Sequence, residues 1–364
     1  MMADMRYRVV QWGTGNTGSA ALAATIGHPD LELVGVWVHS EAKAGRDAGD
    51  LVGLPDTGVV ATNDTDAILA LDADVVSYNA SGDMRPHEAV DDMCRILASG
   101  KNVISTSIVQ LTYPPTGDKT MVSKLQAACE AGGTSWLTSG IDPGFANDQL
   151  PIVMAGWCEY VDTIRVREVL NYATYDQAEI LFDVMGFSKA LDDESVPLFF
   201  PGALCYAWAG PINAMAAALG VELDDIRQTT ERVAADHDIE VPSGHVPAGT
   251  TAAMRFEIQG MVGGEPLIVV EHVTRLARDL APDWPQPVGK GHYDVTIEGS
   301  PSMTCTLQLE GTDGDENTGG VLATVMRLLN MIPAVVDAPP GVLSLFDLPL
   351  VSGLHLMRHG AESP

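Results

Sequence analysis

A glycine-rich hexapeptide near the N-terminus is the segment whose residue types have the clearest chemical meaning. An apolar run, Arg8 to Trp12, precedes it, and an alanine-rich stretch with helical character follows it. The hexapeptide reads Gly13, Thr14, Gly15, Asn16, Thr17 and Gly18. Between a strand and a helix, the first glycine of such a motif allows a tight turn, the second lets a pyrophosphate approach the backbone, and the third permits close helix–strand packing. The segment therefore predicts a dinucleotide-binding turn at the start of a helix.

The end of the second apolar run bears on which dinucleotide would bind. An NAD site commonly places Asp or Glu about 20 residues after the glycines, where the carboxylate holds the ribose 2′-hydroxyl. Here the run Leu31 to Val38 has no carboxylate at its tip, although Glu41 is near. The tip offers an imidazole, a hydroxyl and two cations, which suit a 2′-phosphate; these groups belong to His39, Ser40, Lys43 and Arg46. The sequence favours NADP over NAD, with solvated surface charges as the plainer interpretation of the two cations.

Other groups that could carry acid–base chemistry are dispersed along the chain. Asp142 could be catalytic, but aspartate before a Pro-Gly pair is also an ordinary turn residue. His272, like the other isolated histidines, is interpreted as structural. The five cysteines include no CxxC pair, so neither a zinc site nor a disulfide framework is supported. No bound metal is predicted.

Composition narrows the classes of partner. The chain has 364 residues, of which 46% are hydrophobic, and this excludes intrinsic disorder as the main state. Its 20 Lys and Arg against 49 Asp and Glu give a formal charge of −29, which would repel nucleic acid and anionic membranes. The first residues lack a signal-peptide core, and no uninterrupted apolar stretch reaches the roughly 18 residues of a membrane span. We expect a cytoplasmic protein with no nucleic-acid or membrane partner.

The first 150 residues alternate short strands with helices, and this alternation would position the glycine turn. Apolar runs predict strands at residues 8–12, 31–38, 73–78, 102–105 and 136–139. Helical spacing of apolar residues predicts helices at 15–26, 88–99 and 121–131. Strands of about five residues between helices are typical of an α/β fold with a doubly wound parallel sheet. We expect residues 1–150 to form a dinucleotide-binding Rossmann domain.

The pattern changes from about residue 160 onward. Period-two alternation predicts a strand at 163–170, and further strands are expected at 254–259, 267–273, 292–298 and 303–310. Residues 177–220 have helical character, and a last helix is expected at 318–336. Short connections favour a mainly antiparallel sheet. We expect an α+β substrate and dimerisation domain at 151–317, and a helix and tail at 318–350 that pack back on the first domain. Because one face of such a sheet needs cover, a homodimer is expected.

Four motifs taken together resemble one enzyme family. Beside the glycine turn, they are Ser139 to Phe145, Asn330 to Val336, and Pro340 to Val342 followed by Asp347 to Pro349. They resemble 2,4-diaminopentanoate dehydrogenases and native amine dehydrogenases, relatives of dihydrodipicolinate reductase, and the likeness runs from about Arg6 to Leu350. The resemblance implies a Rossmann domain, a homodimer, and NAD(P)-dependent reductive amination of small ketones or the reverse oxidative deamination. The His-His and Lys signature of dihydrodipicolinate reductase is not visible, so that activity is not expected.

One segment departs from the pattern of that family. After the fourth strand, the family has one or two glutamates shortly before a Tyr-Pro pair, and the glutamate accepts a proton from the amine or ammonia. In this chain Tyr113 and Pro114 are kept, but Val109 and Gln110 stand where the carboxylates would be. Neither can act as a general base at neutral pH. Slow amination is expected, with a gain when Val109 or Gln110 is replaced by glutamate, unless a base elsewhere compensates.

The resemblance also implies an aromatic substrate pocket. Tyr172 and Tyr175 follow the first strand of the second domain, where the family lines that pocket, and Phe145 matches the family's aromatic residue after the Pro-Gly turn. As an alternative, all three are ordinary core aromatics, because buried aromatic rings usually serve packing.

Three interpretations of function remain open. The first is an NADP-dependent oxidoreductase that acts on a small ketone or amine, by reductive amination or imine reduction. The second is an NADP-dependent carbonyl reductase in which Tyr113, Tyr172 or a serine donates a proton to the alkoxide. The third is a cofactor-binding protein that has lost catalysis, which the missing glutamate makes credible. Dependence on ammonium separates the first two, and tight NADPH binding without turnover would indicate the third.

Overall fold

The computed structural model describes residues 6–82 and 85–357, and the chain divides into two compact units. Unit 1 comprises Met1–Gly140 and Thr324–Pro364, and unit 2 comprises Ile141–Ala323. The chain therefore leaves the first unit after the fifth strand and returns to it within a late helix.

Unit 1 is built on a six-stranded parallel sheet with the order β14-β5-β4-β3-β1-β2. The strands are β1 (Tyr7–Trp12), β2 (Leu31–Trp37), β3 (Val75–Tyr78), β4 (Asn102–Ser105), β5 (Ser135–Thr138) and β14 (Gly341–Val342). The chain adds β2 on one side of β1 and then crosses to β3 on the other side. Ligands of open parallel sheets bind at the carboxyl ends of strands beside such a reversal. The predicted doubly wound parallel sheet is confirmed, and residues 13–18 follow β1 at that point.

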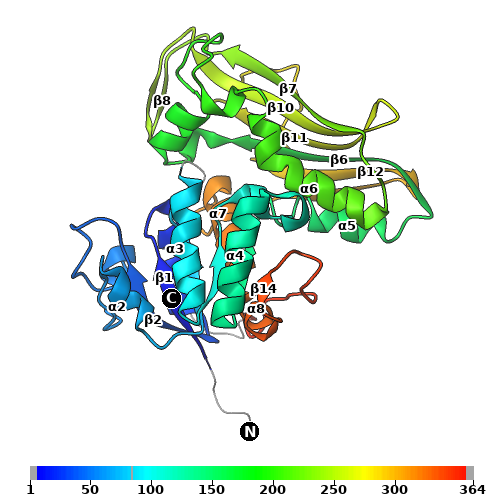
Figure 1. Cartoon of the computed structure of the whole chain (residues 1–364). Helices are drawn as coiled ribbons and strands as arrows, with labels where there is room; N and C mark the ends of the chain where they lie inside the picture. The colour runs from blue at the N-terminus through cyan, green and yellow to red at the C-terminus, as the bar shows by residue number, and fades with distance from the viewer. Residues whose placement is uncertain (1–5, 83–84, 358–364) are drawn as a thin grey trace. The chain divides into compact units, whose positions relative to one another are not determined.

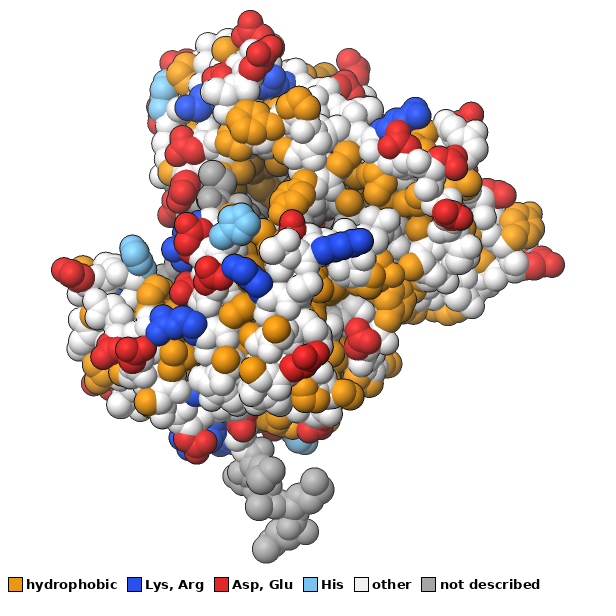
Figure 2. Space-filling view, in the orientation of Figure 1, with side chains coloured by type: hydrophobic (Ala, Val, Ile, Leu, Met, Phe, Trp, Pro, Cys, Tyr) orange, Lys and Arg blue, Asp and Glu red, His pale blue; other side chains and the backbone are white. Residues whose placement is uncertain are grey.

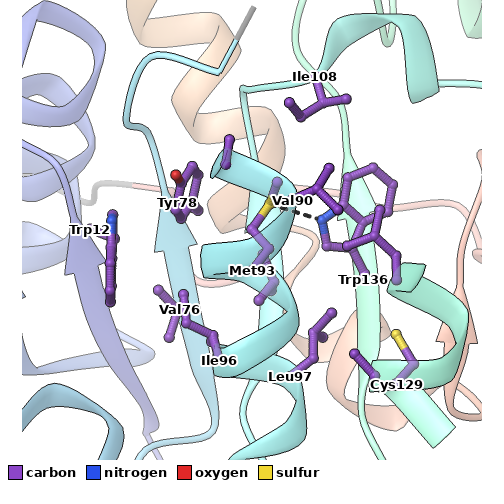
Figure 3. Close-up of a cluster of buried hydrophobic side chains, with 14 of the residues drawn as sticks. Trp12, Val76, Tyr78, Val90, Met93, Ile96, Leu97, Ile108, Cys129 and Trp136 are labelled. Atoms are coloured by element: carbon purple, nitrogen blue, oxygen red, sulfur yellow. Dashed lines mark hydrogen bonds between the residues drawn. The ribbon is translucent and has the colours of Figure 1, made fainter. Parts of the chain in front are cut away.

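Helices α3 (Pro86–Ala98) and α4 (Lys119–Gly132) lie side by side over one face of this sheet (Figure 1). The buried residues of α3 fall at positions 89, 90, 93, 96 and 97, the spacing of one helix face. They pack on Trp12 and Tyr78, the last residues of β1 and β3, and on Trp136 of β5 (Figure 3). The Trp136 indole N–H donates to the Met93 sulfur at 3.1 Å. This packing holds the carboxyl ends of β1 and β3 in place.

The other face of the same sheet is covered by residues from both ends of unit 1. Helix α1 (Asn16–Gly27) lies along β1 and β2, and Val9, Ile104 and Leu137 form a core with Leu328 and Val335. The late helical stretch is two helices, α7 (Glu316–Leu329) and α8 (Ile332–Asp337), so the prediction of one continuous helix at 318–336 is wrong. Pro333 explains the break, because proline lacks an N–H and is favoured in the first turn of a new helix.

By length and composition alone, Glu316–Asp337 is the one described helical stretch apolar enough to cross a membrane. Its residues Leu328, Leu329, Ile332 and Val335 are at most 1% exposed within the core of unit 1. Because 39% of its most apolar window is buried and a core helix passes the same test, this stretch is weak evidence for a membrane span.

Unit 2 contains a six-stranded sheet with the order β13-β12-β6-β11-β10-β7. The strands are β6 (Tyr160–Asn171), β7 (Asp225–Ala234), β10 (Thr251–Val262), β11 (Glu265–Arg275), β12 (His292–Ser300) and β13 (Met303–Leu307), and a separate pair is formed by β8 (Ile239–Val241) and β9 (Gly244–Val246). Helix α6 (Ala203–Leu219) lies across one face of the large sheet (Figure 1). Antiparallel pairing prevails as predicted, except that β6 and β11 run parallel.

In unit 2, one expected helical region is wrong and one strand was not expected. The helical character predicted over 177–220 is realised only in α6 and in the single π-turn at Glu179–Val184. Gly186 and Gly202 adopt φ values of +80° and +82°, and Pro197 begins a short 3₁₀ turn between them, so the chain cannot continue as one helix. Strand β7 was not predicted, because it is an edge strand whose ten residues are all at least partly exposed and mostly polar.

Charged side chains of both signs are mixed on the face of the molecule shown in Figure 2. On the face shown in Figure 2, Lys and Arg side chains lie singly or in small groups among more numerous acidic side chains. No broad basic patch, of the kind that binds a phosphate backbone, is seen on that face.

Candidate functional site

The glycine turn has the shape that a pyrophosphate requires. Gly13 adopts φ of +91°, and a Cβ placed there would lie 3.0 Å from the backbone nitrogen of Ala80. A Cβ on Gly18 would lie 2.3 Å from the carbonyl oxygen of Gly13, so only glycine lets α1 approach the turn this closely. A Cβ on Gly15 would meet no atom within 4 Å, so the space in front of the first turn of α1 is open. These residues fit a dinucleotide phosphate at the N-terminus of α1.

The groups at the tip of β2 are positioned differently from one another. Lys43 Nζ donates to the carbonyl oxygen of Thr14 at 2.7 Å and to its hydroxyl at 3.2 Å, which places a cation against the glycine turn. Arg46 pairs with Asp50 at 2.8 Å. His39 and Ser40 are exposed. The structure thus brings Lys43 to the predicted phosphate site, whereas Arg46 is held by its own carboxylate partner.

The segment that departs from the family pattern is an irregular one. Val109 to Leu111 form a 3₁₀ turn, in which the Gln110 residue is buried. Ile108, directly before it, adopts φ of +62°, which is a rare and strained conformation for a β-branched residue. The Tyr113 ring packs edge-on against Phe346 with their centroids 6.0 Å apart. No carboxylate belongs to this turn, as the sequence indicates.

Unit 2 holds a buried acid–base cluster, defined here as Asp142, Glu168 and His272. One oxygen or ring nitrogen of each residue lies within 4.8 Å of the corresponding atoms of the other two. Asp142 Oδ2 and His272 Nε2 are 2.8 Å apart, and their side chains are 6% and 5% exposed. Asp142 Oδ1 accepts a hydrogen bond from the Trp208 indole at 3.1 Å and another from the Asn147 amide. Both carboxylate oxygens of Asp142 therefore accept hydrogen bonds.

Glu168 has a different environment from Asp142. Its residue is 4% exposed, and the Tyr172 hydroxyl donates to Glu168 Oε1 at 3.2 Å. The Tyr293 hydroxyl also interacts with this carboxyl. Burial raises the pKa of Glu168 to about 7; the His272 charge lowers it and the Asp142 charge raises it. Burial alone would lower the pKa of His272, but the adjacent Asp142 carboxylate raises it overall.

Strand register brings the cluster together. In the sheet, Glu168 of β6 lies directly opposite His272 of β11 on one side and Tyr293 of β12 on the other. Glu168 shares its face of β6 with Ile164 and Val166, which pack under α6. A carboxylate beside Ile164 and Val166 on the buried face of β6 is a signal in the sequence for such a site. The roles of turn residue for Asp142 and structural residue for His272 do not account for their direct contact.

The predicted aromatic residues lie next to this cluster. The rings of Tyr172 and Tyr175 stack with centroids 5.1 Å apart and an interplanar angle of 29°. Phe145 belongs to the same small apolar cluster as Tyr172 and Tyr293. The structure therefore brings Phe145, Tyr172 and Tyr175 together within unit 2, and it joins Tyr172 to Glu168 by a hydrogen bond.

The arrangement can hold a proton at neutral pH. Two carboxylates in different surroundings beside one histidine are the usual way in which proteins separate acid and base roles. The three side chains also have the composition of a cation site, but Asp142 and His272 Nε2 are hydrogen-bonded to each other at 2.8 Å.

Residues 145–360 match the family model described as the 2,4-diaminopentanoate dehydrogenase C-terminal domain. The chain is 43% identical over 347 residues to an amine dehydrogenase of Streptomyces virginiae, covering 94% of this chain and 96% of that protein. It is 27% identical over 362 residues to the 2,4-diaminopentanoate dehydrogenase of Acetoanaerobium sticklandii, covering 95% and 94%.

Solved structures agree in fold. The amine dehydrogenase of Mycobacterium smegmatis superposes with a TM-score of 0.77 at 19% identity, covering 95% of this chain and 97% of that one. A biliverdin reductase from Synechocystis, solved with biliverdin and NADP⁺, gives a TM-score of 0.52 at 16% identity and covers 91% and 90%. Both likenesses concern the fold alone.

Proposed function

Because the chain belongs to the 2,4-diaminopentanoate dehydrogenase and amine dehydrogenase family, we propose that it interconverts a small amine and the corresponding ketone with NADP as the cofactor. The resemblance inferred from the motifs is confirmed by these matches. They show an oxidoreductase that acts on CH–NH2 groups and uses a nicotinamide cofactor. The choice of NADP and the roles of individual residues are our proposal.

The observation that carries the proposal is the open glycine turn in a chain that matches an amine dehydrogenase over 94% of its length. Residues 13–18 would bind the pyrophosphate, with Lys43 and the exposed His39 and Ser40 near the ribose. When bound, a nicotinamide cofactor supplies the hydride acceptor for amine oxidation and the hydride donor for the reverse reaction. Phe145, Tyr172 and Tyr175 would bind the apolar part of the substrate and exclude water from it.

The proposed functions are divided among the three regions expected from the sequence. We assign cofactor binding to residues 1–150 apart from Phe145, substrate binding and dimerisation to 151–317, and a supporting role to 318–350. Homodimer formation through the large sheet of the second part and a cytoplasmic location belong to the same proposal. The five cysteines are all unpaired, which agrees with a reducing compartment.

Cofactor preference can be tested at Lys43. We expect the parent protein to bind NADPH more tightly than NADH, and Lys43→Ala to weaken NADPH binding about tenfold while NADH binding changes little, because the cation that would pair with the 2′-phosphate is lost. Titration followed by nicotinamide fluorescence measures both constants. Arg46→Ala serves as the comparison, since Arg46 is already paired with Asp50. Equal affinity of the parent protein for the two cofactors would contradict the preference for NADP.

Two glycines of the turn should respond differently to alanine. Gly18→Ala forces Cβ against the Gly13 carbonyl, so we expect a loss of about 1–3 kcal/mol in the free energy of unfolding. Gly15→Ala meets no protein atom, so stability should be kept while cofactor binding is lost, because the methyl group fills the space that the phosphate needs. Urea denaturation and cofactor titration of both variants provide the comparison. Unchanged cofactor binding in Gly15→Ala would contradict a phosphate site at this turn.

Activity on a panel of small amines and ketones tests the reaction itself. We expect NADP⁺-dependent oxidation of amines, and NADPH oxidation with ketones only when ammonium is present. Ketone reduction that proceeds equally well without ammonium would assign the chain to carbonyl reduction. Tight NADPH binding with no turnover of any compound would indicate a protein that has lost catalysis.

A further inference from the structure

Glu168 has a hydrogen-bonded connection to the proposed substrate side of unit 2. It is joined to the stacked tyrosines by the Tyr172 hydroxyl, which donates to Glu168 Oε1 at 3.2 Å. Tyr172 itself is partly exposed, whereas Glu168 behind it is 4% exposed. A proton that reaches the Tyr172 oxygen can therefore pass to the carboxylate without crossing water.

From this arrangement the geometry points to Glu168 as the group that takes up and returns the proton during amine turnover, with the Tyr172 hydroxyl as the relay between the substrate nitrogen and the carboxylate. The inference rests on the proposed amine dehydrogenase activity. It supplies the base that the turn at 109–110 lacks.

The proton transfer can be written with all atoms accounted for. In amine oxidation the substrate arrives as an ammonium ion, and one N–H bond breaks as its proton moves to the Tyr172 oxygen. The Tyr172 O–H bond breaks at the same time, and that proton bonds to Glu168 Oε1. The nitrogen keeps the electron pair, and the neutral amine is the form from which a bound nicotinamide would accept hydride. In reductive amination the same two protons move in the opposite direction.

The surroundings of both groups fit these roles. Burial, followed by the charge of Glu168, raises the pKa of Tyr172 well above its ordinary value, so this hydroxyl stays protonated and relays a proton only by taking one up as it gives its own to Glu168. Glu168 has a pKa of about 7, so its charged and neutral forms are both populated near neutral pH, as a general base and acid requires. Proton exchange at this carboxyl therefore needs no large change in pH.

The other titratable groups around Glu168 leave it as the acceptor. Asp142 comes from the loop after β5, and its oxygens accept hydrogen bonds from Trp208, Asn147 and His272. His272 of β11 has its Nε2 on Asp142, and Tyr293 of β12 has a pKa raised well above the ordinary value by burial and by Glu168. These groups set the charge around Glu168, and within the described part of the chain the Tyr172 hydroxyl donates its hydrogen bond to Glu168.

The test uses three variants of the full chain, Glu168→Gln, Glu168→Asp and Tyr172→Phe. The matched control is Glu265→Gln, at the exposed first residue of β11. We expect Glu168→Gln to lower kcat/KM for amine oxidation about 10²–10⁴-fold at neutral pH. In the parent enzyme, kcat/KM should fall on the acid side with an apparent pKa near 7, and Glu168→Gln should lose this limb. Glu168→Asp should restore part of the rate and keep the limb, and Tyr172→Phe should lower the rate although Glu168 is intact.

Each alternative outcome is decisive. Parent turnover of amines with an unaffected Glu168→Gln overturns this inference and leaves the proposed function standing. A parent enzyme with no amine turnover overturns both. If Glu168→Gln has a lower rate, a lower thermal stability and an unchanged acid limb, Glu168 has a structural role only. If a chelator abolishes the activity of the parent enzyme, the cluster binds a metal. Either result overturns the proton relay.

Discussion

Glu271→Ala is expected to lower the free energy of unfolding by about 3 kcal/mol, at the lower end of the range for breaking a buried ion pair. The Glu271 side chain is 0% exposed and accepts hydrogen bonds from Arg165 at 2.7 Å, Arg167 at 2.9 Å and Arg255 at 2.8 Å. Removing this carboxylate leaves three guanidinium groups crowded together without their shared partner. Because these arginines keep 26–33% of their side chains exposed, solvent offsets part of the loss.

Urea denaturation of the parent protein and of Glu271→Ala measures this difference. Glu298→Ala provides the control, because Glu298 belongs to the same sheet but is exposed, and its carboxylate accepts a hydrogen bond from the Thr163 hydroxyl. A loss in Glu271→Ala no larger than that in Glu298→Ala would show that the three arginines are stable without the carboxylate.

The same carboxylate determines how that stability depends on pH. Burial tends to raise the pKa of Glu271, but the hydrogen bond and charge of Arg167 and the charges of Arg165 and Arg255 hold it below its ordinary value of 4.5. A carboxyl whose pKa is lower in the folded state stabilises the fold above the unfolded pKa and loses this contribution as the pH falls through the folded pKa. The stability gap between the parent and Glu271→Ala should therefore be full at neutral pH and should narrow below about pH 4.5.

The fold of unit 1 could be predicted because each of its elements is specified by a short segment of contiguous sequence. Each strand of the parallel sheet is a short apolar run between helices, and the glycine turn follows β1 directly in the sequence. In unit 2 the local signal misleads. Residues 177–202 have helical composition, but Gly186 and Gly202 with positive φ interrupt them, and the polar edge strand β7 resembles a surface loop.

The acid–base cluster could not be predicted because it depends on pairing between distant strands. Glu168 and His272 face each other only through the parallel register of β6 and β11, and sequence alone favoured antiparallel pairing in this sheet. Asp142 reaches the same place from the loop after β5. The sequence did contain one usable signal, since alternation in β6 places Glu168 on the face of Ile164 and Val166, which is otherwise apolar.

The variants Val109→Glu and Gln110→Glu separate two hypotheses about the base. If the family's carboxylate position still governs the reaction, either variant should raise amination about 10²–10⁴-fold, the usual contribution of a general base. If Glu168 is the proton acceptor, neither should raise it. We expect the second result, together with a loss of about 1–3 kcal/mol in stability for Gln110→Glu, because a carboxylate would replace an amide that is 7% exposed.

The decisive measurement is the amination rate of both variants and the parent across the neutral pH range, with thermal unfolding of each. The variants are then combined with Glu168→Gln. If a carboxylate at 109 or 110 restores turnover only in the Glu168→Gln background, it can replace Glu168 as the proton acceptor. A large gain in amination rate in the otherwise unchanged chain would instead assign the base to the turn after β4. An enzyme with a working proton acceptor at Glu168 would gain little rate from a second one.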